Sequence, residues 1–281
     1  MITFQKAERK KSKLRLGISA PSGGGKTYSA LLIAYGITKD WSKIAVIDTE
    51  RGSAELYSDL GEYCVAQLTP PFTPQKYIET IHCAEQSGFE VIIIDSLSHA
   101  WTGEGGMLEM QDTVARASKS GNSYTAWREV TPLHNKLVDT ILQSPSHIIV
   151  TTRSKTEYVL QTDDKGKITP KKVGLSPVFR DGLEYEMTVF IDMSTEHVAT
   201  ATKDRTRLFD GKYFTPSINT GESLYNWLNS GAENKAPVCP KCGNEIKPAT
   251  CKDGSILRPN EILQRYGCCA DCVRKQNEPK E

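Results

Sequence analysis

The sequence predicts an α/β fold with a mostly parallel sheet and a small module appended near its end. Three observations predict this fold. Short apolar runs alternate with segments of helical periodicity, a glycine-rich turn joins the first run to the first helix, and two close pairs of cysteines lie near the end of the chain. Runs that are apolar throughout are typical of parallel strands covered by helices on both faces.

The elements follow in order from Leu14 onward. Apolar runs predict four buried strands. The intervening helical patterns predict three helices, and we expect Thr131 to cap the last of them and Pro132 to open it. Two further strand-like segments joined by a short turn predict an antiparallel edge. The expected strands are residues 14–19, 43–50, 91–96, 147–153, 185–193 and 197–205, and the expected helices are residues 27–38, 77–86 and 133–143.

The composition is that of an ordinary globular protein. The 281 residues carry a formal net charge of +1, so any basic binding surface must be local. The chain shows no secretory signal and no apolar run long enough to span a membrane, which makes the cytoplasm the expected compartment. A polar, proline-containing stretch without periodicity, residues 229–238, marks a boundary. We therefore expect one domain at residues 1–230 and a second at residues 237–275.

The glycine-rich turn is "APSGGGKT", residues 20–27. It has the Walker A pattern with alanine in place of the first glycine, and it lies between an expected strand and an expected helix, as the motif requires. Its backbone N–H groups can form a concave nest for a phosphate, which side chains in place of the glycines would block. Lys26 supplies a full charge to the outer phosphates of ATP, and the Thr27 hydroxyl reaches Mg²⁺. The residues expected to bind the nucleotide are Ser22, Gly23, Gly24, Gly25, Lys26 and Thr27.

Acids at strand ends complete this site. Asp95 ends the run "VIIIDS" and is expected to hold the Mg²⁺ shell. In many P-loop ATPases the catalytic acid directly follows that aspartate, but here Ser96 occupies the position. Glu50, at the end of "IAVIDTE", is therefore the best candidate for the carboxylate that orients or deprotonates water. Asp48 and Glu55 are weaker candidates for the same role.

Together, "APSGGGKT", "VIDTE", "VIIIDS" and "TATKDR" resemble the RecA-like ATPase core. The resemblance implies a RecA-like P-loop NTPase fold that hydrolyses ATP, with Glu50 as the catalytic glutamate. It also implies a polar sensor near Thr152 and Arg153. Finally, it implies that Lys203 and Arg205 act catalytically on the nucleotide of a neighbouring subunit in a homo-oligomer.

Longer stretches resemble a family of phage and prophage ATP-binding proteins. These are "DSLSHAWTGEGG", "TAWREVTPLHNKLVDTIL", "RSKTEYV" and "KDRT", and the resemblance covers roughly residues 12–230. Members of the family are associated with phage recombination as RecA-like single-strand annealing proteins. The resemblance therefore implies a role on single-stranded DNA in recombination or repair.

Two long polar segments follow the third and fourth strands, where RecA-like proteins bind DNA. Basic residues mixed with aromatic ones suit a single strand, because cations track phosphates and rings stack on bases. The alternative is a solvated surface, in particular a hairpin around "TDDKGK". Trp101 and Trp127, in contrast, are expected to pack in the core. The DNA-binding candidates are Arg116, Lys119 and Tyr124 in residues 102–126, and Lys155, Tyr158, Lys165, Lys167, Lys171, Lys172, Phe179 and Arg180 in residues 154–181.

Two Cys-x-x-Cys pairs, Cys239/Cys242 and Cys269/Cys272, lie in the last part of the chain. Each pair places two thiolates on one tight turn, and two such turns complete a tetrahedron around zinc, which predicts a zinc-ribbon or treble-clef knuckle. A redox pair is the alternative, but it lacks the βαβ context of a thioredoxin motif. Cys251 and Cys268 are spare: Cys268 could compete with Cys269, but only Cys269 is in register with Cys272. Cys64 and Cys83 are expected to be reduced core thiols.

The combined expectation is a DNA-stimulated ATPase that acts on single-stranded DNA and uses ATP, Mg²⁺ and Zn²⁺. One alternative is an interaction protein in which ATP is a conformational switch and the zinc module docks replication or recombination proteins. A small-molecule P-loop kinase is less favoured, because the sequence shows no arginine-rich lid.

Overall fold

The computed structural model describes residues 6–117, 123–162, 168–232, 237–251, 256–257 and 259–277. The contacts divide the chain into two compact units. The larger comprises Ser12–Ser230, and the smaller comprises Met1–Lys11 together with Gly231–Glu281. Of the described residues, 6–11 group with the smaller unit, whereas we expected one domain over residues 1–230. Within the described residues, no helix is both long and apolar enough to cross a bilayer.

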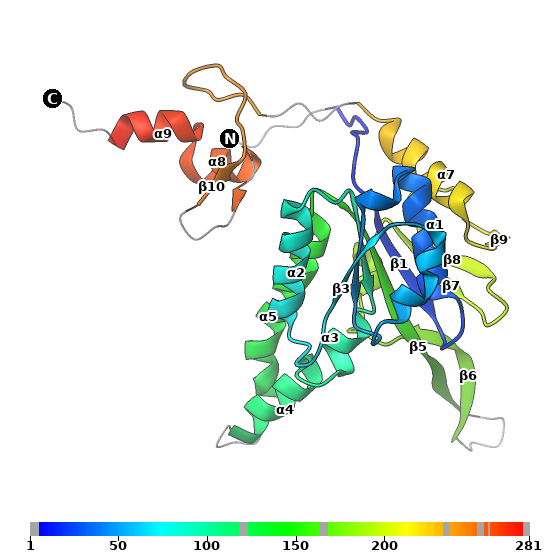
Figure 1. Ribbon diagram of the computed structural model, residues 1–281. Helices are drawn as coiled ribbons and strands as arrows, with labels where there is room; N and C mark the ends of the chain where they lie inside the picture. Colours follow the sequence, from blue (N-terminus) through cyan, green and yellow to red (C-terminus); the bar gives the residue numbers. More distant parts are fainter. Residues whose placement is uncertain are drawn as a thin grey trace. The chain divides into compact units, whose positions relative to one another are not determined.

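A nine-stranded sheet forms the centre of the larger unit (Figure 1). Its strands follow the order β3-β2-β4-β5-β1-β7-β8-β9, and β6 pairs with β5. All pairs from β3 to β7 along this order are parallel, while β7–β8, β8–β9 and β5–β6 are antiparallel, which confirms the mostly parallel sheet and its antiparallel edge. The strands are β1 (Arg15–Ala20), β2 (Ile44–Asp48), β3 (Cys64–Gln67), β4 (Val91–Asp95), β5 (His147–Thr162), β6 (Ile168–Pro177), β7 (Val189–Met193), β8 (Ala199–Asp204) and β9 (Tyr213–Phe214).

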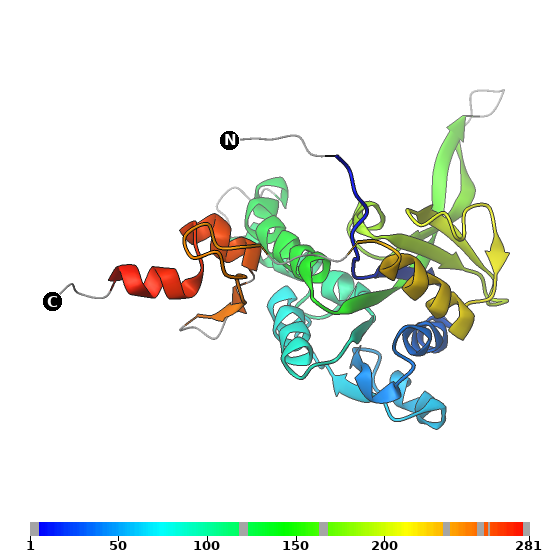
Figure 2. The same cartoon turned by 90° about the horizontal axis from the view of Figure 1, so that it is seen from above.

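Helices cover both faces of the sheet (Figures 1 and 2). Because successive side chains of a strand point to opposite faces, Ile93 joins the core under α1 and α7, while Ile92 and Ile94 join the core under α2 and α5. Fully burying one such side chain stabilises the fold by about 1.5–3 kcal/mol. The helices are α1 (Lys26–Thr38), α2 (Pro74–Gln86), α3 (Ser98–Thr102), α4 (Met107–Ala117), α5 (Ser123–Gln143), α6 (Leu183–Glu186) and α7 (Ile218–Asn229), with 3₁₀ helices at Trp41–Lys43 and Ser53–Leu60.

One long helix replaces the helix that we expected to begin at Pro132. Pro132 lies inside α5, so the prediction that it opens the helix is wrong. An interior proline costs about 3 kcal/mol because it removes a helical hydrogen bond. Here Pro132 faces solvent, while Val130, Leu137 and Ile141 are buried along one stripe on both sides of it, and this packing holds the helix together. Thr131 is no cap, and its hydroxyl instead accepts a hydrogen bond from Arg180.

Other differences have local causes. α4 lies in a segment expected to be a loop, and its buried face, Met107, Gln111 and Ala115, is too weakly apolar to reveal a helix in the sequence. The strand expected from residue 185 begins only at Val189, because α6 occupies the preceding residues. Cys64 and Cys83 are exposed, so the prediction that they are core thiols is wrong. Cys64 lies on the edge strand β3 and Cys83 on the outer face of α2.

The smaller unit is built of short elements. β10 (Ala249–Thr250) and β11 (Ile256–Leu257) pair in antiparallel fashion, and α8 (Pro259–Tyr266) and α9 (Ala270–Asn277) follow. Its buried cluster contains two isoleucines, and the other members are cysteines: Cys239, Ile246, Ile262, Cys268 and Cys269. A core this small rarely stabilises a fold alone, which makes a structural metal a natural source of the missing free energy.

Candidate nucleotide-binding site and cysteine cluster

The Walker A loop connects β1 to α1. Gly23 and Gly25 have φ angles of 78° and 81°, in the left-handed region that glycine adopts without steric cost. Gly25 is the N-cap of α1, so the unpaired N–H groups of the first helical turn lie at the loop. Lys26 Nζ donates to the carbonyl oxygens of Ala20 and Pro21, each at 3.1 Å. The local sequence therefore folds into the strand–loop–helix unit that the motif requires.

A neighbouring turn approaches Gly25 closely. A Cβ atom added to Gly25 would lie 2.9 Å from Nδ1 of His197. His197 belongs to the turn between β7 and β8, and it is itself held at a φ of 63°. The φ of Gly25 therefore favours glycine, and any side chain there would also force the exposed His197 ring to move.

Thr27 and Asp95 meet at the start of α1. Thr27 Oγ1 donates to Asp95 Oδ2 at 2.5 Å, and the Thr151 hydroxyl on β5 donates to Oδ1. Burial raises the pKa of Asp95, and the two hydrogen bonds oppose this shift. A hydroxyl and a carboxylate are the kind of oxygen ligands that Mg²⁺ takes in nucleotide sites. The structure therefore brings together the two residues expected to hold the metal.

Glu50 is held by an arginine and a serine. Arg153 Nε donates to Glu50 Oε1 at 2.9 Å, Arg153 Nη2 donates to Oε2, and Ser96 Oγ donates to Oε1 at 3.0 Å. Burial alone raises the pKa of Glu50, but the hydrogen bonds outweigh it, so the pKa lies below its ordinary value. The same pair raises the pKa of Arg153. Glu50 is thus charged and positioned, but both of its oxygens are engaged.

The charged groups around the loop act on one another. Burial lowers the pKa of Lys26, the carboxylates of Asp95 and Glu50 oppose this shift, and the charge of Arg153 adds to it. The groups come from the start of α1, the ends of β2 and β4, and the middle of β5.

Thr152 was expected, with Arg153, to mark the polar sensor. It is buried, and its hydroxyl has no hydrogen-bond partner within the described residues.

The two weaker acidic candidates have structural partners. Asp48 is 1% exposed, and its two oxygens accept hydrogen bonds from the backbone N–H groups of Glu50, at 2.6 Å, and Ala54, at 3.0 Å. Glu55 accepts a hydrogen bond of 2.8 Å from the side chain of Gln67. Asp48 therefore shapes the turn that presents Glu50.

Sequence reasoning missed one histidine beside Glu50 and two tyrosines near the start of α1. His99 Nδ1 lies 2.7 Å from Thr49 Oγ1, the ring stacks on Phe72, and burial lowers the pKa of His99. Tyr28, near the start of α1, is 42% exposed, and its ring centroid lies 5.6 Å from that of Tyr57. A tyrosine immediately after the Walker A motif was a usable signal, whereas nothing local marks the histidine.

Lys203 and Arg205 lie together at the end of β8. Lys203 Nζ and Arg205 Nη2 both donate to the carbonyl oxygen of Tyr185, the arginine at 3.0 Å. Burial lowers the pKa of Lys203, and the neighbouring arginine adds to this shift. The action of this pair on a neighbour's nucleotide stays a prediction.

The first segment predicted to bind DNA is largely helical. Arg116, in the last turn of α4, and Tyr124, in the first turn of α5, are both exposed, the tyrosine by 83%. Lys119 lies outside the described residues. Trp101 and Trp127 stack with ring centroids 5.5 Å apart against the core, as expected.

The second such segment is the antiparallel hairpin of β5 and β6, which projects from the sheet (Figure 2). Lys155 is exposed on β5, and Tyr158 of the same strand pairs in register with Lys172 of β6, beside Lys171. Lys165 and Lys167 lie outside the described residues.

Two members of this segment are part of the core or tied to it. Phe179 is 5% exposed and packs against Trp101, so the prediction that it stacks on bases is wrong. The guanidinium of Arg180 lies 5.4 Å from the ring centroid of Trp127 and is hydrogen-bonded to α5, which leaves it little freedom to track phosphates.

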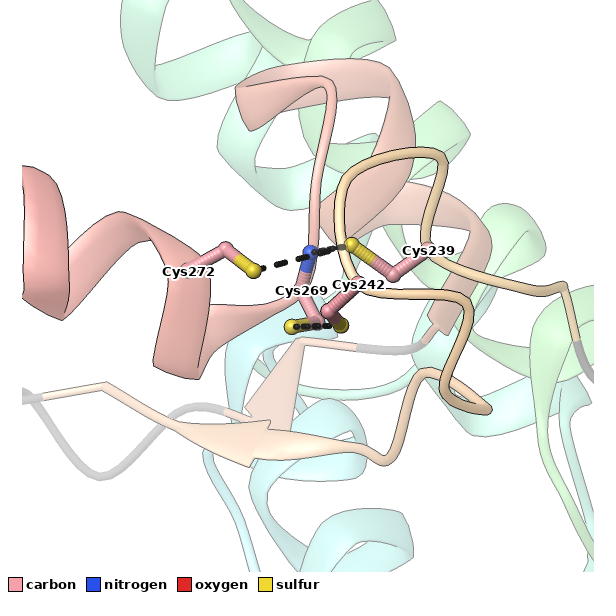
Figure 3. A group of neighbouring side chains, drawn as sticks. All are labelled: Cys239, Cys242, Cys269 and Cys272. Atoms are coloured by element: carbon pink, nitrogen blue, oxygen red, sulfur yellow. Dashed lines mark hydrogen bonds between the residues drawn. The ribbon is translucent and has the colours of Figure 1, made fainter.

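The four paired cysteines of the smaller unit converge (Figure 3). Their Sγ atoms all lie within 4.8 Å of one another, with Cys239 and Cys272 3.9 Å apart and Cys242 and Cys269 3.6 Å apart. Zinc–sulfur bonds of about 2.3 Å in a tetrahedron imply sulfur–sulfur distances of roughly 3.8 Å. The geometry of these four cysteines, hereafter the cysteine cluster, thus fits zinc.

The surroundings of the cysteine cluster also suit a metal. The backbone N–H of Cys269 donates to Cys239 Sγ at 3.2 Å and lowers the pKa of that thiol, which favours the thiolate. Cys268 is buried but points elsewhere, toward the carbonyl oxygen of Tyr266. Cys251 is outside the cluster as well.

Comparisons with known proteins show the family. Residues 12–218 match a family described as an AAA domain, and the chain belongs to this family. Among solved structures, one match is a prototypical ATPase from the type III secretion system of pathogenic bacteria, with 14% identity and a TM-score of 0.34. That alignment covers 65% of this chain and 51% of the other, so the match spans about half the length of that ATPase. No curated protein matches the chain.

Proposed function

We propose that the larger unit binds ATP with Mg²⁺ and hydrolyses it. The observation that carries the proposal is the 2.5 Å hydrogen bond between Thr27 and Asp95, where the Walker A loop enters α1. Thr27 and Asp95 would hold Mg²⁺ through a hydroxyl and a carboxylate oxygen, and the metal, when bound, would neutralise the charge that develops on the outer phosphates. Membership of the AAA domain family supports an ATPase in general.

The residues of the chain have separable roles in this proposal. The loop N–H groups and Lys26 bind and orient the phosphates. Glu50, once released from Arg153, accepts a proton from the attacking water. The hydrogen bond from the Ser96 hydroxyl keeps the Glu50 carboxylate in position. The ion pair in the structure is then the resting state, and hydrolysis requires that Arg153 moves.

Two substitutions test the proposal. Lys26→Ala should lose ATP binding, measured with a fluorescent ATP analogue, because the loop loses its full positive charge. Glu50→Gln should keep binding but lose phosphate release, because an amide cannot accept the proton. Lys43→Ala and Glu62→Gln are matched controls, because both residues are exposed and have no assigned role. Hydrolysis at the normal rate by Glu50→Gln would show that the base lies elsewhere.

A second candidate function is a nucleotide-dependent switch. The observation that favours it is the engagement of both Glu50 oxygens by Arg153, which holds the acid away from catalysis. In that case ATP would change the conformation of the chain while turnover stayed near zero. Protection from proteolysis by ATP without phosphate release would support the switch over the enzyme.

Single-stranded DNA is the proposed nucleic-acid partner, in phage-type recombination or repair. The exposed Arg116 and Tyr124 and the hairpin that carries Lys155 support it, together with the resemblance described above. Stimulation of ATP hydrolysis by a single-stranded oligonucleotide tests it, and an unchanged hydrolysis rate would favour the switch.

The cysteine cluster is proposed to bind one zinc ion and to serve as a docking module for a DNA or protein partner.

A further inference from the structure

A cavity of about 400 Å³ lies beside Glu50. The ends of β2 and β3 line it, together with Phe72, His99 and Arg153. Glu50 is part of its wall, so a molecule in the cavity would touch the group proposed as the base. Crevices at the carboxyl ends of parallel strands are where α/β folds bind ligands. The proposed ATPase function does not account for this space.

Arg51 is the most unusual residue of the cavity wall. It directly follows Glu50, is exposed, and has a φ of 58°, in the left-handed region that a non-glycine residue adopts at a cost of about 1 kcal/mol or more. Within the described part of the chain, its guanidinium forms no ion pair or hydrogen bond. A strained backbone that presents an unmatched cation to a cavity is typical of a binding position.

The other charges of the cavity are already matched. Glu50 pairs with Arg153, and Asp48 gives both oxygens to backbone N–H groups. The remaining wall combines amide and hydroxyl groups of Gln67 and Thr69 with apolar surface from Leu68 and Phe72. Arg51 is therefore the charged group of this wall that has no direct partner among the described residues, so it suits a single negative charge, and the mixed wall suits a sugar and a base.

We propose that this cavity binds one nucleotide unit, with its phosphate on Arg51. The volume lies in the range of small-ligand pockets, which are about 300–1,000 Å³. The nucleotide can be a free mononucleotide or one unit of a single-stranded nucleic acid, since both offer the same phosphate and base. The inference goes beyond the proposed ATPase function, because binding here requires neither the Walker A loop nor hydrolysis.

The test uses the full chain with Lys26→Ala, so that the Walker A loop no longer competes for nucleotide. Binding of thymidine monophosphate and of a thymidine oligonucleotide is measured without ATP, before and after Arg51→Gly. Glycine adopts the left-handed conformation freely, so this change removes the cation while relieving strain. Arg51→Asn is a second variant that tolerates the same conformation.

Arg207 provides a matched control. It is also an exposed arginine in the left-handed region, with a φ of 62°, and it lies outside the cavity. Arg207→Gly therefore removes the same charge and the same kind of strain.

We expect Arg51→Gly to weaken binding of the probe at least tenfold and to leave the midpoint of thermal unfolding unchanged or higher. Arg207→Gly should leave binding intact. If thymidine monophosphate binds, a free nucleotide is enough to occupy the cavity. If only the oligonucleotide binds, the ligand is a single-stranded nucleic acid. In that case the loss of one phosphate contact in Arg51→Gly should reduce the slope of log affinity against log salt by about 0.7. Equal binding by Arg51→Gly and its parent, or no binding of either probe to the parent, overturns the proposal. Because ATP plays no part, these outcomes are independent of whether the chain hydrolyses ATP.

Discussion

Removal of the Arg153 side chain tests whether the ion pair restrains hydrolysis. Arg153→Ala deletes two hydrogen bonds to Glu50 and leaves the backbone bonds of Arg153 in the sheet intact. The pKa of Glu50 should then rise, because burial, which raises it, is no longer outweighed by the arginine. A freed carboxylate with a higher pKa is a better proton acceptor, so basal hydrolysis should increase.

The size of the increase follows from the exposure of the pair. The Arg153 side chain is 50% exposed and that of Glu50 is 22% exposed, so solvent screens their attraction. Exposed pairs contribute about 0–1 kcal/mol, and bidentate geometry places this pair at the upper end of that range. Because about 1.4 kcal/mol corresponds to a tenfold change in rate, we expect basal hydrolysis to rise about fivefold.

The assay is phosphate release at saturating ATP, with Arg128→Ala as a control that removes an exposed arginine from α5. The double variant Arg153→Ala, Glu50→Gln should be as slow as Glu50→Gln alone, because the gain depends on the freed carboxylate. A loss of hydrolysis in Arg153→Ala with normal ATP binding would refute the reasoning, since the arginine would then act on the nucleotide rather than restrain the acid.

Three further predictions concern the metal, the assembly and the sheet. Metal analysis should find about one zinc per chain, and its removal by a chelator should unfold the smaller unit; oxidised thiols and no metal in protein purified without chelators would contradict the cysteine cluster as a zinc site. Arg205→Ala and Lys26→Ala subunits should each be inactive alone and regain activity when mixed, whereas full activity of Arg205→Ala as a monomer would exclude a shared site. Burial raises the pKa of Asp192 on β7 from 3.8 to about 6, so the folded state holds a proton that the unfolded state releases, and the free energy of unfolding falls as pH rises through that interval. The shift corresponds to about 3 kcal/mol before screening, so Asp192→Asn should stabilise the chain at pH 8 by about 1–2 kcal/mol in denaturant titrations, and an unchanged pH dependence would show that Asp192 is not the group responsible.

The Walker A loop and the cysteine cluster were predictable because their information is local. In both, a few neighbouring residues set a turn whose backbone directs the binding groups, and residue type and spacing report that turn directly. The mostly parallel sheet was predictable for a related reason, since a strand covered on both faces must be apolar throughout. The helices that bury small or polar faces, such as α4, carry no equally strong pattern and were missed.

The ion pair between Glu50 and Arg153 was beyond such reasoning. The two residues are 103 positions apart, and they meet only because β4 lies between β2 and β5 in the sheet. Apolar runs predict that strands exist but not their order. The burial of Phe179 has the same origin, because its aromatic ring reads equally well as a base-stacking or a core residue until Trp101 is placed beside it.

The choice of the catalytic acid shows what the structure adds to the pattern. Asp48, Glu50 and Glu55 lie within eight residues, and carboxylate chemistry alone does not separate them. The hydrogen-bond partners do. Both oxygens of Asp48 accept from backbone N–H groups, so protonating or moving it would undo the turn that carries its neighbours. Glu50 is held only by side chains, of Arg153 and Ser96, which can rotate away when a nucleotide arrives. A carboxylate fixed by the backbone orients the chain, whereas one fixed by side chains can be released to do chemistry. Glu50 and Glu55 both meet this condition, since Glu55 is held by the side chain of Gln67, but Glu50 is the one whose charge acts on Lys26 of the Walker A loop.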